Sequence, residues 1–198
     1  MTPGRGVVVR AEAVAAECVA THQRIYQEDN PGLVAAARLL ENIRELMREV
    51  PQRKAYYPGV DKRQQAVIDA NPNAETFPDD VPRTLVTDLP ADDSANMCFN
   101  EEFFGPVLAQ TSLPAPSAEA FMERAVAFCN DTLDGTLGAN ILIHPITMKQ
   151  LGAKLENYIA DLLYGAVAVN GWNALAYLLV QAPWGAFPGH TIDDIQSG

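Results

Sequence analysis

The segment Glu101–Pro114, "EEFFGPVLAQTSLP", places two carboxylates and two aromatic rings directly before an apolar run. Gly105 and Pro106 are typical of a turn, and residues 107–113 have the composition of a β-strand. Residues 84–89, "TLVTDL", predict another strand upstream. The Glu-Glu-Phe-Phe segment is therefore expected to lie between two strands.

Working outward from this segment, helix and strand patterns alternate without an internal repeat. Further strands are predicted at three places: 7–9, 137–143 and 166–170. Apolar spacing predicts helices over five stretches: 14–25, 31–50, 61–71, 117–129 and 147–164. This alternation is typical of an α/β fold with a parallel sheet.

Several helix ends carry local signals. Asp61 with Gln64, and Thr147 with Gln150, have the spacing of capping boxes. Gly165 is expected to end the last helix in a left-handed conformation. Residues 71–82 contain three prolines and are expected to form a loop.

Net charge and cysteine content limit the class of protein. A formal charge of -11 and a pI near 4.6 argue against nucleic acid or anionic membrane surfaces as partners. No apolar stretch reaches the roughly 18 residues of a membrane span, and the first residues lack a signal-peptide core. Cys18, Cys98 and Cys129 are odd in number and widely spaced, as reduced thiols would be. We expect a soluble, cytoplasmic protein.

Four sequence blocks carry a family resemblance. They are "EEFFGPVLA" at 101–109, "AVAFCNDTLDGTLGANILIHP" at 125–145, "LLYGAVAVN" at 162–170 and "APWGAFPG" at 182–189. Their order and approximate spacing resemble the catalytic domain of the aldehyde dehydrogenase superfamily. Residues 97–198 match well, whereas residues 1–96 match only in helix and strand order. The resemblance implies one incomplete domain over 1–198, a three-layer α/β/α fold with a mainly parallel sheet.

The resemblance also implies a cofactor, NAD or NADP. Glu102 would bind the nicotinamide ribose and Phe104 would contact the nicotinamide ring. A carboxylate suits a pair of hydroxyls, and an apolar ring can hold a planar heterocycle. From the residues alone, Glu101 and Glu102 could instead be a solvated pair beside two core rings. Phe103 is expected in the core.

A second group of residues resembles the wall of the family's substrate tunnel. Asn170 and the apolar run after it, including Ala174 and Leu175, would line the path of a small-molecule aldehyde. Ordinary core packing is an equal alternative for these residues. "PWGAF" departs from the family's Pro-Phe-Gly-Gly by carrying Trp184 and Ala186.

The family oxidises aldehydes through a cysteine thiohemiacetal, with the nucleophile on a Gly-Gln-x-Cys loop. No such loop occurs in this sequence. Cys18 lies in an alanine-rich helical stretch, and Cys98 and Cys129 are expected to be small buried side chains. The nucleophile, the general base and the dinucleotide-binding domain are therefore expected outside this chain.

Two functions remain open. The chain is either a fragment of an NAD(P)-dependent aldehyde dehydrogenase, inactive alone and homo-oligomeric, or a catalytically silent binding or assembly module of the same fold. His22, His144 and His190 lack metal-ligand spacing, so no metal is expected.

Overall fold

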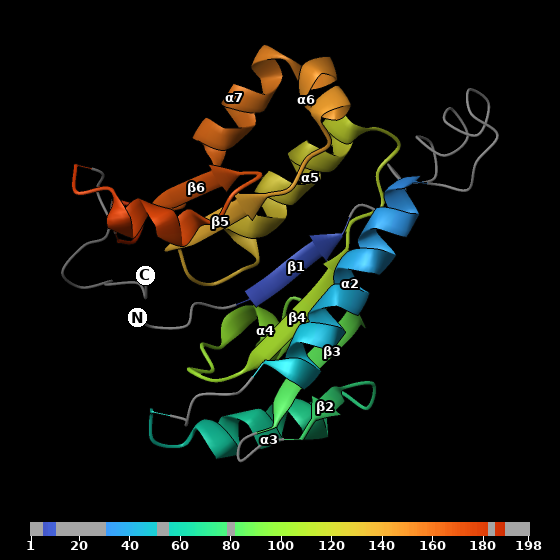
Figure 1. Ribbon diagram of the computed structural model, residues 1–198, viewed down its shortest axis with the longest axis vertical. Helices are drawn as coiled ribbons and strands as arrows, with labels where there is room; N and C mark the ends of the chain where they lie inside the picture. Colours follow the sequence, from blue (N-terminus) through green and yellow to red (C-terminus); the bar gives the residue numbers. More distant parts are fainter. Residues whose placement is uncertain (1–5, 11–30, 51–55, 79–81, 182–184, 189–198) are drawn as a thin grey trace. The chain divides into compact units, whose positions relative to one another are not determined.

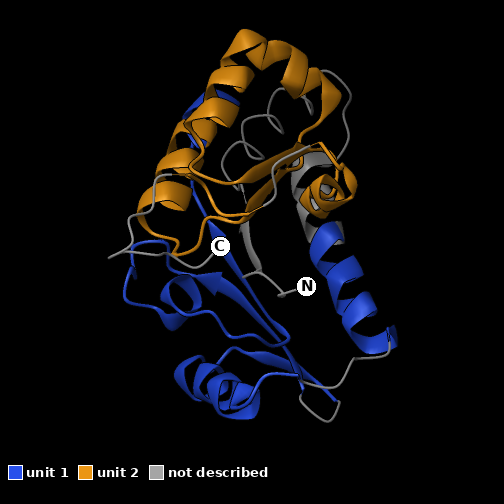
Figure 2. Ribbon diagram, turned by 90° about the vertical axis from the view of Figure 1, so that its left-hand side faces the viewer, with its two compact units in different colours: residues 1–121 blue, residues 122–198 orange. Residues whose placement is uncertain are grey.

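A computed structural model describes residues 6–10, 31–50, 56–78, 82–181 and 185–188. The chain divides into two compact units, residues 1–121 and 122–198 (Figure 2). Among the helices of the described residues, none is long and apolar enough to cross a membrane.

The first unit contains a four-stranded sheet in the order β1-β4-β3-β2 (Figure 1). Its strands are β1 (Gly6–Arg10), β2 (Glu75–Phe77), β3 (Arg83–Leu89) and β4 (Val107–Ser112). β4 pairs in parallel with both β1 and β3, whereas β2 pairs antiparallel to β3. The predicted strands at 7–9, 84–89 and 107–113, and the mainly parallel sheet, are confirmed.

The expectation of a loop over residues 71–82 is wrong, because β2 lies within this range. Pro72 and Pro78 flank the strand rather than interrupt it. β2 is an edge strand that pairs only with β3, so flanking prolines remove no hydrogen bond from the ladder.

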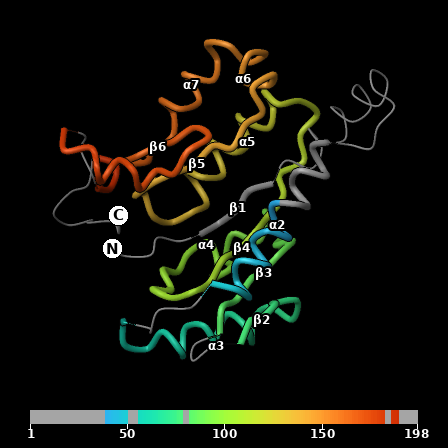
Figure 3. The backbone as a smooth tube through the Cα atoms, viewed as in Figure 1, coloured from blue at the N-terminus to red at the C-terminus, as the bar shows by residue number. Residues whose placement is uncertain are grey.

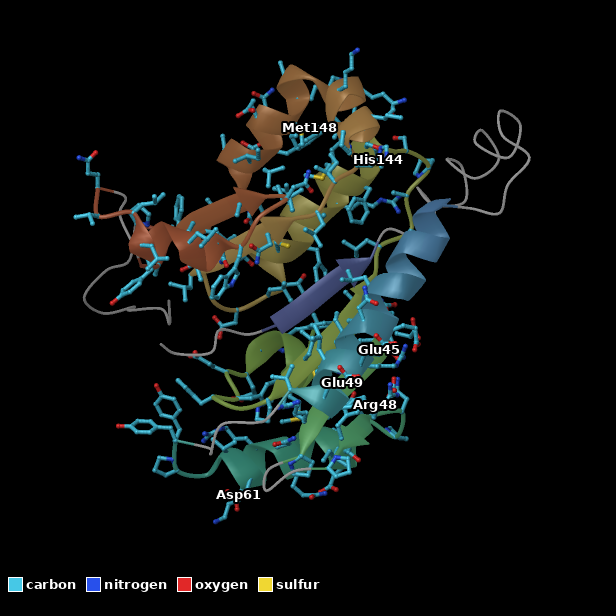
Figure 4. All side chains as sticks on the ribbon, in the orientation of Figure 1. Glu45, Arg48, Glu49, Asp61, His144 and Met148 are labelled. Atoms are coloured by element: carbon cyan, nitrogen blue, oxygen red, sulfur yellow. The ribbon has the colours of Figure 1, made fainter. Side chains whose placement is uncertain are left out.

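The C-terminal half of helix α2 (Pro31–Glu49) contacts β2 and the start of β3, and the predicted helix over 31–50 is confirmed. Arg44 donates a bidentate hydrogen bond to the Glu75 carboxylate on β2, with Nη2 to Oε1 at 2.7 Å and Nε to Oε2 at 2.9 Å. Arg48, labelled in Figure 4, lies over the Phe77 ring at 5.4 Å. The Arg83 guanidinium donates to the Met47 carbonyl at 2.7 Å and so caps the end of α2.

Helix α3 (Val60–Ala70) covers the face opposite to α2. Gln64 Nε2 donates to Thr84 Oγ1 at 2.7 Å, whereas the next residue back on β3, Arg83, binds α2. Successive side chains of a strand point to opposite faces, so α2 and α3 lie on different sides of the sheet. The three-layer arrangement predicted for the fold is present in this unit.

The predicted capping box of Asp61 and Gln64 is wrong. The N-cap of α3 is Gly59, with φ of 77° and no side-chain hydrogen bond to the helix. Gln64 is 2% exposed and donates to Thr84 instead. Burial against the sheet therefore decides the role of Gln64, and spacing alone does not.

The core of the first unit lies on both faces of β3 and β4. Its fully buried apolar side chains include Val60, Val67, Leu85, Val86, Phe99 and Ala109. Phe99 belongs to α4 (Met97–Asn100), a short helix that the sequence pattern did not predict. Asn96 caps α4 by accepting a hydrogen bond from the Cys98 N–H at 3.1 Å.

The second unit contains two parallel strands, β5 (Gly138–Ile141) and β6 (Ala166–Val169). Helices α6 (Pro145–Leu151) and α7 (Ala153–Asp161) connect them, and the 3-10 helix η1 (Asn173–Leu178) follows β6. Figure 3 traces this path. Helix α5 (Ala118–Asp131) precedes β5, and the Ser117 Oγ accepts from the Ala120 N–H at 3.1 Å, as its predicted N-terminus requires.

The single helix predicted over 147–164 is instead two helices, which meet at Gly152 with φ of 54°. His144 caps α6, because its Nδ1 accepts from the Ile146 N–H at 3.2 Å, so the Thr147 capping box is wrong. His144 and Met148 are labelled in Figure 4, and the Met148 N–H donates to the His144 carbonyl at 2.9 Å. Thr147 is already inside the first turn.

The predicted left-handed cap at Gly165 is also wrong. Helix α7 ends at Asp161 with Leu162 as its C-cap in an extended conformation. Gly165 instead allows close approach of the backbone, since an added Cβ would lie 1.7 Å from the Gly185 carbonyl oxygen. Leu142, predicted within the strand 137–143, lies beyond β5, which ends at Ile141, and is 66% exposed.

Candidate functional site

The loop Glu101–Pro106 joins α4 to β4 and lies at the amino ends of β3 and β4. It is fixed there because the Thr84 N–H donates to the Pro106 carbonyl at 2.9 Å. Phe103 is 7% exposed, which confirms its expected place in the core. Glu102 and Phe104 are half-buried, whereas Glu101 is exposed. The loop thus anchors one ring in the core and leaves its neighbours partly accessible.

Phe104 has a left-handed backbone conformation, with φ of 51°. This region is uncommon for a bulky residue and requires support from its surroundings. The next residue is a glycine, and a larger residue would clash there, because an added Cβ at position 105 would lie 2.6 Å from Val60 Cγ1 on α3. The turn predicted at Gly105 and Pro106 therefore passes directly over the amino end of α3.

Two side chains near the amino end of α3 contact Phe104. The Tyr57 ring lies 4.9 Å from the Phe104 ring, with the two planes tilted by 50°. The Arg63 guanidinium lies over the Phe104 ring, with Cζ 5.7 Å from its centroid. Arg63 Nε also donates to the Phe103 carbonyl at 3.0 Å, and Nη2 donates to the Pro58 carbonyl at 3.2 Å.

The aromatic cluster consists of Tyr56, Tyr57 and Phe104. Tyr56 packs edge-on against Tyr57 with centroids 5.3 Å apart, and Tyr56 is 88% exposed. Tyr57 and Arg63 were not predicted as site residues. The only sequence signal was the pair of tyrosines before Pro58-Gly59, at the start of a predicted helix.

Asn170, Ala174 and Leu175 lie in the second unit, after β6. Asn170 has φ of 51°, and its side-chain amide bonds to the Ile143 backbone at both ends. Its Oδ1 accepts from the Ile143 N–H at 2.8 Å, and its Nδ2 donates to the Ile143 carbonyl at 2.9 Å. The side chain of Asn170 thus extends the pairing of β5 and β6 by one step.

A shallow apolar pocket of about 250 Å³ lies beside β6 and η1. The residues around it are Ala166, Val167, Ala168, Gly171, Trp172, Asn173, Leu175, Ala176 and Leu179. Leu175 lines this pocket, whereas Ala174 is half-buried on η1 outside its lining. No charged side chain is among the lining residues, so the pocket suits a hydrocarbon group.

The two cysteines of the described residues are poor nucleophiles. Burial raises the pKa of the Cys98 thiol to about 11. Burial also raises the pKa of Cys129 to about 11, and the hydrogen bond from Tyr164 opposes that rise. A thiolate is the reactive form of cysteine, so the raised pKa disfavours the reactive form of both side chains near neutral pH.

Some sequence-based candidates lie outside the part of the chain that the structure describes. They are Cys18, His22, Trp184 and His190. Within the described residues, no group of three His, Cys, Asp or Glu side chains is placed to hold a metal ion.

Comparison with solved structures shows that the fold of this chain is similar to that of aldehyde dehydrogenases. A protein described as an aldehyde dehydrogenase from Burkholderia cenocepacia matches with a TM-score of 0.58 and 19% identity, over 95% of this chain and 44% of that one. A 1-pyrroline-5-carboxylate dehydrogenase variant from Thermus thermophilus matches with a TM-score of 0.58 and 14% identity, over 93% and 38%. A betaine aldehyde dehydrogenase from Staphylococcus aureus, in complex with NAD, matches with a TM-score of 0.54 and 14% identity, over 93% and 40%.

These likenesses show the fold. The chain has the fold of part of an aldehyde dehydrogenase, as predicted, and spans 38 to 44% of the length of these three structures. No family model matches the sequence. No curated protein matches it.

Proposed function

We propose, from the aldehyde dehydrogenase fold of the chain, that it supplies the nicotinamide-side contacts of an NAD(P)-dependent aldehyde dehydrogenase. Glu102 and Phe104 are the proposed cofactor residues. The observation that carries the proposal is the supported loop: Phe104 is half-buried and held from α3 by the Arg63 guanidinium at 5.7 Å. A ring held in this way keeps one orientation and retains accessible surface for a ligand.

The residues of the loop fit NAD or NADP. Glu102 is half-buried on the loop that also carries Phe104, and its two carboxylate oxygens can accept from both hydroxyls of a ribose. The Phe104 ring offers an apolar surface to a planar heterocycle. When bound, NAD or NADP supplies an acceptor for the two electrons that leave the aldehyde carbon. The loop would bind and orient the nicotinamide end of that molecule.

The second unit supplies the proposed aldehyde contacts. Leu175 lines the apolar pocket, and Ala174 belongs to the same 3-10 helix. Asn170 would contribute by holding the turn that leads to this helix, since its amide is bonded to Ile143. We expect the pocket to bind the hydrocarbon part of an aldehyde and to exclude water from it.

The nucleophile is proposed to lie outside this chain, because no Gly-Gln-x-Cys loop occurs in the sequence and burial raises the pKa of the Cys98 and Cys129 thiols. The 198-residue chain alone is then expected not to oxidise aldehydes. Rapid mixing of the chain with NAD and a panel of aldehydes tests this. A burst of NADH absorbance would refute the proposal that the chain lacks the nucleophile.

Binding of nicotinamide mononucleotide to the 198-residue chain tests the cofactor residues directly. Glu102→Gln keeps the volume and removes the charge. Hydrogen bonds to a charged group are worth about 1.5 to 3 kcal/mol, so affinity should fall about tenfold or more. Glu101→Gln is the matched control, since Glu101 is the exposed neighbour. Equal affinities of the two variants, measured by ligand-observed NMR, would contradict the proposal.

A second candidate is a catalytically silent binding or assembly module of the same fold. The raised pKa values of Cys98 and Cys129 are compatible with this candidate as well as with the dehydrogenase fragment. This candidate predicts no response of the Glu102 loop to nicotinamide mononucleotide. The coding sequence upstream also separates the two, since an in-frame Gly-Gln-x-Cys loop there would support the dehydrogenase.

A further inference from the structure

We propose that Arg63 is a positioning residue for the loop Glu101–Pro106 and that it sets the orientation of the Phe104 ring. Its consequence for cofactor binding rests on the function proposed for Glu102 and Phe104. Arg63 comes from α3, some forty residues before the loop. It contacts the loop at the backbone and at the ring.

The first contact fixes the backbone. Arg63 Nε donates to the Phe103 carbonyl at 3.0 Å, and this carbonyl belongs to the peptide unit that leads into Phe104. Holding that peptide restrains the φ angle of Phe104, which is 51°. A left-handed conformation at a bulky residue persists only where its surroundings enforce it. The hydrogen bond from Arg63 is such a restraint.

The second contact anchors Arg63 itself. Nη2 donates to the Pro58 carbonyl at 3.2 Å, on the segment before α3. The guanidinium is planar, so these two hydrogen bonds fix its plane. The rigid plane then lies over the Phe104 ring at 5.7 Å. A lysine has one ammonium group in place of the planar guanidinium, so it could not bond to both carbonyls and lie over the Phe104 ring at the same time.

Tyr57 completes the support. The Tyr57 ring packs on the Phe104 ring with centroids 4.9 Å apart. Tyr57 directly follows the exposed residue Tyr56 in the sequence. Arg63 and Tyr57 therefore restrain the ring from the same end of α3. Because the core side chains Val60 and Val67 hold α3 against the sheet, loss of Arg63 should leave the helix in place.

The experiment compares Arg63→Met with Lys62→Met in the 198-residue chain. Lys62 is the exposed neighbour on the same helix, so both variants lose one positive charge. The first readout needs no ligand: the ring resonances of Phe104 in a ¹³C-phenylalanine sample, assigned with Phe104→Leu. The second readout is the affinity for nicotinamide mononucleotide. Thermal unfolding of each variant reports whether it folds.

We expect Arg63→Met to move the Phe104 ring resonances toward the values of the unfolded chain. It should also lower the affinity for nicotinamide mononucleotide at least fivefold. Lys62→Met should change neither. Arg63→Lys should resemble Arg63→Met, because the charge alone does not restore the fork. If Arg63→Met fails to fold, Arg63→Lys provides the same comparison.

Unchanged Phe104 resonances in a folded Arg63 variant would overturn the positioning role. Altered resonances with unchanged affinity would overturn its consequence for the cofactor. If the unaltered chain does not bind the nucleotide, the function proposed for Glu102 and Phe104 fails, and the ligand-free resonances still decide the role of Arg63.

Discussion

The side chain of Gln110 on β4 accepts a hydrogen bond from the backbone N–H of Asp88 on β3, with Oε1 at 2.9 Å. The register of the two strands shifts between Val86 and Leu89, and Asp88 has φ of 57°. Gln110 is fully buried. The Gln110 side-chain oxygen thus replaces the β4 backbone carbonyl that would bond to Asp88 in a regular pair of strands. The Gln110 Nε2 donates to Ser112 Oγ at 3.1 Å.

Gln110→Met should therefore destabilise the first unit. The change keeps the approximate volume but removes the acceptor of the Asp88 N–H. This hydrogen bond is partly buried, and such a bond contributes about 0.5 to 1.5 kcal/mol. Ser112→Ala is the control, because it removes only the onward contact. Urea unfolding measures both. Equal losses for the two variants would show that the bond to Asp88 carries little of the stability.

The ion pair of Arg44 and Glu75 should make stability depend on pH. Hydrogen bonds from Arg44 hold the pKa of the Glu75 carboxyl below its usual value. The unfolded chain therefore binds the proton more readily, so the stabilisation is present above the usual carboxyl pKa near 4.5 and is lost as pH falls through the lower folded value. The pair is partly exposed, and its contribution should be about 1 kcal/mol or less.

Glu75→Gln tests this dependence. The variant should be less stable than the unaltered chain at pH 7, and the difference should shrink as pH falls below about 4. Arg44 also pairs with Glu41, whose side chain is 62% exposed. Glu41→Gln removes this second carboxylate and should lower the stability less than Glu75→Gln. Urea unfolding at pH 7, 5 and 3.5 gives the comparison. A constant difference across this range would contradict the assignment.

The two described cysteines should resist alkylation. A pKa of about 11 leaves little thiolate at pH 7.5 in Cys98 and Cys129, and Cys98 is only 1% exposed. In a Cys18→Ser background, iodoacetamide should label the folded chain about 100-fold more slowly than the unfolded chain, because a pKa of about 11 lowers the thiolate fraction and burial restricts access. Mass spectrometry follows both sites. Rapid labelling of either would indicate an accessible thiolate.

The apolar surface of the second unit should promote self-association. Leu178 is 69% exposed, Val180 is 99% exposed and Trp172 is 63% exposed. Neighbouring exposed apolar side chains favour association with another surface. Sedimentation over a wide concentration range should show species larger than the 21.5 kDa monomer. A compact monomer that binds no hydrophobic dye would contradict this expectation.

Leu178→Lys with Val180→Lys should shift the chain toward the monomer. The control Gln150→Lys with Asn157→Lys adds the same two positive charges at exposed positions on α6 and α7, away from these residues in sequence. Both changes alter net charge in the same direction, so only the apolar loss distinguishes them. Equal sedimentation of the two variants would indicate that charge alone controls association.

The candidate site could be predicted only in part. The motif around Glu102 and Phe104 was visible in the sequence because its residues are adjacent. Arg63 was not visible, since it meets Phe103 only after the chain folds. The general expectation that ligands bind at the carboxyl ends of parallel strands would not have found the loop either, because it lies at the amino ends of β3 and β4.

The sequence by itself determined the α/β order, the strands at 84–89 and 107–113, and the helix over 31–50, because apolar periodicity and proline positions act over neighbouring residues. Tertiary structure alone decided that Gln64 binds Thr84 and that Asn170 binds Ile143. These side chains offer the same polar groups to local and distant partners. Burial against the sheet makes the choice for Gln64, and the pairing of β5 with β6, which brings Ile143 beside Asn170, makes it for Asn170.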